Sequence, residues 1–141
     1  MDRLPAFAYL HPVWQGLTLV FGLYLSATGV RNIENPNFSV RKHKRIGRIF
    51  LIMIIAGAVF GKVIAASLPL GTFRMPGHVF LAVLITILAI LGAVFGFQGE
   101  RKRLRVRTGM MRAHPWFFVA VTALVFAQAL MGLRALHIIK F

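Results

Sequence analysis

The sequence MPGHVFLAVLITILAILGAVFGFQG, at residues 75–99, runs without a charged side chain and is dominated by Leu, Ile, Val, Ala and Gly. A helix needs about 20 such residues to cross the hydrocarbon core of a bilayer, which is about 30 Å thick. Two further stretches without charge, 4–30 and 113–133, also reach this length. The sequence therefore predicts at least three helices that cross a membrane.

A fourth span is shorter and is bounded by basic residues. Its uncharged centre is 49–61, with Arg48 before it and Lys62 after it. Because long basic side chains extend to the interface while their methylene stems stay in lipid, we expect a helix over about 43–66. The predicted fold is an all-α membrane protein, an up-down four-helix transmembrane bundle forming a single domain over 1–141, with spans at about 9–31, 43–66, 77–98 and 113–136.

The composition favours a membrane protein and excludes several kinds of chemistry. Of the 141 residues, 58% are hydrophobic and 14% are charged, whereas a soluble domain has about 25% charged residues. A chain of this size folded in water would leave too much apolar surface exposed. The absence of Cys excludes disulfides, iron–sulfur ligation and the covalent attachment of c-type haem. The first ten residues lack a basic n-region and a small-residue cleavage site, so no removable signal peptide is expected.

The basic residues predict the orientation of the chain in the membrane. Lys and Arg number 17 against 3 Asp and Glu, and twelve of the 17 lie in the connecting segments 31–48 and 100–112. Their position between apolar runs is typical of membrane proteins, so no nucleic acid is expected as a partner. The positive-inside rule places both segments in the cytoplasm and both termini on the outer, periplasmic side of a bacterial inner membrane. The segments are interpreted as topology signals that contact anionic membrane lipid.

Each predicted span has a histidine at or near its start. These residues are His11, His43, His78 and His114. One histidine at a helix end is more often an interfacial polar residue than a ligand, but four of them, one per helix, favour a function. The alternating direction of the helices places His11 and His78 near the outer face. His43 and His114 then lie near the inner face, and each pair comes from diagonal helices. Two imidazoles facing each other across a bundle are the axial ligands of a b-type haem, whereas zinc and di-iron sites need Cys or carboxylate ligands, which are absent or scarce here.

A glycine follows each of these four histidines by 18 residues. The glycines are Gly29, Gly61, Gly96 and Gly132. Eighteen residues are five helical turns, so each glycine shares a face with its histidine about 27 Å away, in the opposite leaflet. Gly29 and Gly96 come level with the inner histidines, and the other two glycines with the outer ones. The missing side chains would leave room for a porphyrin, although glycines also let helices pack closely without a cofactor.

Five other residues carry weaker predictions. Arg48 and Arg112 are candidates to pair with haem propionates on the inner side, although both also serve as topology signals. His137 is an alternative outer ligand, a residue of a quinone pocket or an interfacial residue. Gln15 and Gln128 are polar groups in apolar helices, and each can hydrogen-bond a histidine ring nitrogen, a quinone or a neighbouring helix.

Short motifs around the four histidines are similar to those of a known family. They are HPVWQG at 11–16, RKHKRIGR at 41–48, PGHVFLAV at 76–83 and RAHPWFF at 112–118. With one histidine per helix, paired one-three and two-four, the chain resembles the small four-helix di-haem prokaryotic type of the cytochrome b561 superfamily. The resemblance covers roughly 9–136 and implies a core that holds two haems b. Eukaryotic members have flanking helices and use ascorbate. Those helices are missing here, so no ascorbate site is carried over.

The function expected from these features is that of a di-haem b-type membrane cytochrome, which transfers electrons across the bilayer between the quinone pool and a redox partner. The cofactors are two haems b, with a quinone as a further candidate. The chain would be an electron-transfer protein or a quinone-linked oxidoreductase subunit, in contact with a redox partner protein, a larger respiratory complex or further copies of itself as a homo-oligomer. Two alternatives stay open: a haem-bearing membrane anchor subunit of a larger oxidoreductase, and a haem-free structural or assembly subunit.

Overall fold

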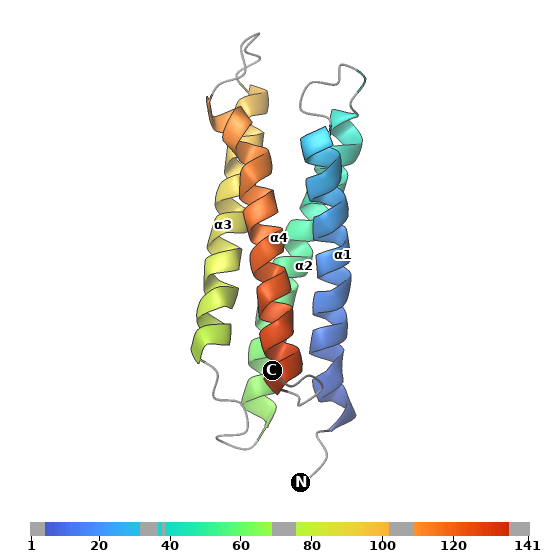
Figure 1. The fold of residues 1–141 in the computed structure, drawn as a ribbon, viewed down its shortest axis with the longest axis vertical. Helices are drawn as coiled ribbons and strands as arrows, with labels where there is room; N and C mark the ends of the chain where they lie inside the picture. The colour runs from blue at the N-terminus through green and yellow to red at the C-terminus, as the bar shows by residue number, and fades with distance from the viewer. Residues whose placement is uncertain (1–4, 32–36, 38, 69–75, 102–108, 136–141) are drawn as a thin grey trace.

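The computed structural model describes residues 5–31, 37, 39–68, 76–101 and 109–135, and it is built from helices (Figure 1). A single 3-10 turn, η1 (Ala6–Tyr9), leads into the first of four long helices. The helices are α1 (Leu10–Arg31), α2 (Val40–Ser67), α3 (Pro76–Arg101) and α4 (Gly109–Ala135). All four are long and apolar enough to cross a membrane. The prediction of an all-helical protein with four membrane-spanning helices is confirmed for the described residues.

The helix starts follow from local sequence. Ser39 precedes α2, and its hydroxyl accepts a hydrogen bond from the Lys42 backbone N–H at 3.4 Å, as an N-cap residue does. This cap explains why α2 begins at Val40, slightly before the expected 43. Pro76 opens α3 at the position where the missing N–H of proline leaves no hydrogen bond unmade.

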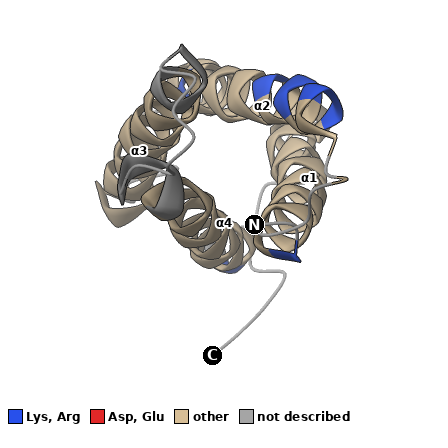
Figure 2. Cartoon of the chain, turned by 90° about the horizontal axis from the view of Figure 1, so that it is seen from above, with Lys and Arg blue, Asp and Glu red and all other residues tan. Residues whose placement is uncertain are grey.

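The four helices form a ring in which each packs against two neighbours (Figure 2). The packed pairs are α1 with α2, α2 with α3, α3 with α4, and α4 with α1. Helices α1 and α3 therefore lie across the ring from each other, as do α2 and α4. Eight buried hydrophobic residues from all four helices fill the centre, and they are Leu25, Phe50, Ile54, Ile85, Ala89, Phe118, Val121 and Val125.

The outer surface of the bundle is also apolar. Val20, Ile52 and Phe80 are 62%, 64% and 67% exposed, and large exposed hydrophobic side chains occur on every helix. A soluble monomer rarely exposes apolar surface of this extent. The outward side chains are therefore those expected to face lipid tails.

Polar side chains inside the bundle join neighbouring helices. The Trp14 indole N–H donates to the Met53 carbonyl at 2.9 Å, which links α1 to α2. The Ser26 hydroxyl donates to the Phe118 carbonyl at 3.2 Å, which links α1 to α4. Such bonds hold transmembrane helices together where lipid offers no other polar partner.

Candidate functional site

The four histidines predicted to act together lie in two pairs across the ring. His11 of α1 and His78 of α3 have ring centroids 6.1 Å apart and planes tilted by 69°. His43 of α2 and His114 of α4 also have ring centroids 6.1 Å apart, with planes tilted by 77°. Each pair joins two helices from opposite sides of the ring. The structure thus brings the histidines together in the pairs expected from the sequence, and their role as haem ligands stays a prediction.

Each glycine of the 18-residue pattern lies beside a histidine of the adjacent helix. A Cβ atom built on Gly61 would come within 2.7 Å of Cε1 of His11, and one on Gly96 within 2.8 Å of Cε1 of His114. The other two contacts are looser. They are 3.6 Å from Gly29 to Cε1 of His43 and 3.7 Å from Gly132 to Cε1 of His78.

These contacts are reciprocal between consecutive helices. Between α1 and α2, His11 of α1 lies beside Gly61 of α2, and His43 of α2 lies beside Gly29 of α1. Helices α3 and α4 do the same with their own histidines and glycines. Because Gly29 lies beside His43, the two pairs are separated by about 27 Å along α1. The levels predicted for the glycines are confirmed, and the space at each glycine is occupied by an imidazole ring.

The ring nitrogens of the two pairs differ in their hydrogen bonds. His114 Nδ1 donates to the Gly92 carbonyl at 2.8 Å, because a carbonyl oxygen can only accept. This bond fixes the proton on Nδ1 and leaves a lone pair on Nε2. In the other pair, Nδ1 of His11 and Nδ1 of His78 are buried, and neither has a hydrogen-bond partner in the part of the chain that the structure describes. His78 Nε2 lies 3.4 Å from Nε2 of the Gln128 carboxamide.

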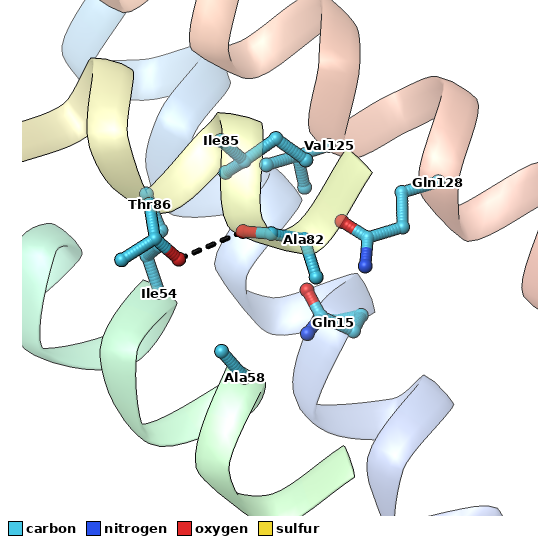
Figure 3. Close-up of a pocket in the computed structure, with 8 residues that line it drawn as sticks. All are labelled: Gln15, Ile54, Ala58, Ala82, Ile85, Thr86, Val125 and Gln128. Atoms are coloured by element: carbon cyan, nitrogen blue, oxygen red, sulfur yellow. Dashed lines mark hydrogen bonds between the residues drawn. The ribbon is translucent and has the colours of Figure 1, made fainter. Parts of the chain in front are cut away.

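A small polar cavity lies one helical turn from the His11/His78 pair, towards the centre of the bundle (Figure 3). Its polar side chains are Gln15, Thr86 and Gln128, and it has room for about one water molecule. The Thr86 hydroxyl already donates to the Ala82 carbonyl at 2.8 Å. The remaining walls are apolar, and they come from Ile54, Ala58, Ala82, Ile85 and Val125.

The donor atoms fit a b-type haem. In each pair two imidazoles from opposite sides of the ring have centroids 6.1 Å apart, and imidazole nitrogens are the donors that would hold a haem iron. A tetrahedral zinc site needs three or four ligands, and no cluster of three or more His, Cys, Asp or Glu side chains is found among the described residues.

The basic residues at the start of α2 lie at the end of the bundle that carries His43 (Figure 2). Arg48 is exposed, five residues after that histidine. Arg112 is part of α4, but its side chain lies outside the described residues, and so does all of His137. The roles predicted for Arg112 and His137 therefore stay predictions.

One functional feature has no counterpart in the sequence analysis. The Gly92 carbonyl is the partner of His114, and a backbone acceptor has no residue type by which sequence reasoning could identify it. The available signal is the spacing of Gly92 and Gly96 on one face of α3, which marks a close approach of two helices.

Comparison of this chain with known protein families, with curated proteins and with solved structures gives no match.

Proposed function

We propose that this chain is a di-haem b-type membrane cytochrome that transfers electrons between the two faces of a bilayer. The observation that supports it best is the pair of facing histidines at each end of the bundle, with ring centroids 6.1 Å apart in both cases. His11 and His78 would hold one haem, and His43 and His114 the other. Ionisable side chains at membrane depth are costly and mark function by default, which favours ligation over a structural role.

The protein residues would bind, orient and shield the two groups. Haem iron supplies reversible one-electron oxidation and reduction when it is bound. The Gly92 carbonyl holds the His114 ring in one tautomer, so Nε2 would offer its lone pair to a haem iron. The Phe118 ring lies 5.1 Å from the His114 ring and 6.1 Å from Phe50. These aromatic side chains belong to the buried core and exclude water from the space between the two pairs.

The orientation in the membrane follows from the charge pattern. The proposal is an up-down bundle with the basic segments 31–48 and 100–112 in the cytoplasm and both termini outside, in a bacterial inner membrane. The His43/His114 pair is then the inner site and the His11/His78 pair the outer one. The exposed basic side chains at the start of α2 would contact anionic lipid headgroups. Electrons would pass between the quinone pool and a redox partner, in either direction according to the potentials of those partners.

The direct test is the number of haems per chain. Haem is measured by the pyridine haemochrome spectrum and protein by amino-acid analysis, on the full chain purified in detergent. We expect two low-spin haems b in the unmodified chain and one in the His78→Ala variant. Gly47→Ala is the matched control with two haems, because a Cβ atom there meets nothing within 4 Å. A ratio near zero in the unmodified chain would identify a haem-free structural subunit and refute the proposal.

A further inference from the structure

The two histidine pairs are unequally prepared to bind a metal. In the His43/His114 pair, one imidazole is anchored through Nδ1 to the Gly92 carbonyl at 2.8 Å, and its Nε2 lone pair is left for a ligand. In the other pair the pattern of His78 is reversed. Its Nδ1 has no hydrogen-bond partner among the described residues, and its Nε2 is 3.4 Å from the carboxamide nitrogen of Gln128.

The contact with Gln128 uses the nitrogen that an iron would need. With the carboxamide N–H as donor, it takes the lone pair of His78 Nε2, and the ring proton is on Nδ1. With the carboxamide turned over, its oxygen accepts from an Nε2 that carries the proton, because amide nitrogen and oxygen exchange places by a simple rotation. In both orientations the Gln128 contact must break before His78 Nε2 binds a metal.

Gln128 has space to move to when that contact breaks. The side chain is 5% exposed and comes from α4 into the polar cavity, where Gln15 of α1 points towards it (Figure 3). Gln15 lines the same cavity, and its carboxamide can accept or donate a hydrogen bond. The carboxamide can therefore leave the histidine without becoming a buried polar group that lacks a partner.

We propose that Gln128 is a positioning residue that caps Nε2 of His78 in the haem-free protein, so that the His43/His114 pair takes up haem before the His11/His78 pair. The inference rests on the proposed function, because it requires that both pairs bind haem. A single hydrogen bond of this kind changes a binding equilibrium by about two- to tenfold. Removing the cap therefore tightens haem binding at the His11/His78 pair by that factor and leaves the other pair unchanged.

The test is a haem titration of the haem-free full chain, followed by Soret absorbance, with Gln128→Leu as the main variant. It is carried out in the unmodified chain and in a His114→Ala background, in which only the His11/His78 site binds. Thr86→Val is the matched control, since it removes a polar group from the same cavity but leaves Gln15, Gln128 and the contact with His78 in place. Gln128→Met is a second variant with an unbranched side chain, and circular dichroism checks that each variant keeps its helices.

We expect two binding steps in the unmodified chain. His78→Ala should abolish the weaker step and His114→Ala the tighter one, and Gln128→Leu and Gln128→Met should tighten the weaker step alone. If Gln128→Leu leaves that step unchanged, weakens it or alters the tighter one, the cap is wrong, although the protein still binds two haems. If the unmodified chain binds no haem, the proposed function is wrong and the cap fails with it.

Discussion

The Gly61→Ala variant tests whether His11, which lies beside this glycine, binds a metal. The new Cβ atom would lie 2.7 Å from Cε1 of His11, which is 0.7 Å less than the 3.4 Å at which ordinary contact begins. A free imidazole at the end of a flexible side chain can move away from this methyl group. An imidazole that, together with His78, would hold a haem iron could not move away in this manner. The strain therefore falls on the haem-bound state.

The size of the effect follows from the cost of overpacking, which is about 1–3 kcal/mol in a filled site. This corresponds to about five- to 150-fold weaker haem binding at the His11/His78 pair. Gly132→Ala is the matched control, because its Cβ atom would lie 3.7 Å from the other ligand of the same pair, at an ordinary contact distance. We expect this variant to bind haem like the unmodified chain.

The assay compares haem titrations and redox titrations of the two variants. Gly61→Ala should lose affinity or one redox component, and Gly132→Ala neither. The second pair repeats the experiment, with Gly96→Ala at 2.8 Å as the strained variant and Gly29→Ala at 3.6 Å as its control. If the strained variant and its control lose haem affinity equally, or if Gly61→Ala loses both haems, the glycines serve helix packing alone.

Three other predictions concern the remaining features. A reporter that is active only outside the cytoplasm should be active when it is fused after Phe141. Activity of a reporter that works only in the cytoplasm would contradict this orientation and would exchange the inner and outer assignments of the two proposed haems. Leucine is larger than the alanine expected to fit at position 29. Gly29→Leu should therefore remove the haem of the His43/His114 pair and spare that of the other pair, which a redox titration would measure. Trp14→Phe removes the hydrogen bond to Met53 and should lower the free energy of unfolding by about 1 kcal/mol, measured by denaturant titration, with both haems retained.

The spatial pairing of the histidines was predictable because helical geometry is regular. An 18-residue interval is five turns, so Gly29 had to lie level with a histidine one span away, and it lies beside His43. The four spans were equally predictable from the sequence, since a helix that crosses a bilayer requires a length of apolar chain that few other structures need. The first prediction depends on helical periodicity and the second on the length of an apolar run, and the sequence contains both directly.

Contacts that depend on tenths of an ångström were not predictable. The sequence gives Gly61 and Gly132 the same role, whereas their Cβ positions lie 2.7 Å and 3.7 Å from a histidine. The difference arises from how closely each pair of helices packs, which depends on every side chain along the interface. Gln128 was predicted to hydrogen-bond a histidine ring nitrogen, a quinone or a neighbouring helix, but the choice of His78 among these depended on the rotation of α4 about its axis.

Under the proposed function, the arrangement of the histidine pairs would give haem binding a structural consequence as well as a redox one. The bundle consists of two consecutive helix pairs, α1 with α2 and α3 with α4, and each contributes one histidine to each site. The histidine pairs therefore span the diagonals of the ring, which are not among the closely packed helix pairs. A ligand bound by both histidines connects helices that the protein's own packing leaves apart. Because such a ligand would bind the folded bundle and not its separated halves, it would stabilise the bundle by mass action, and haem uptake would be coupled to assembly of the two halves.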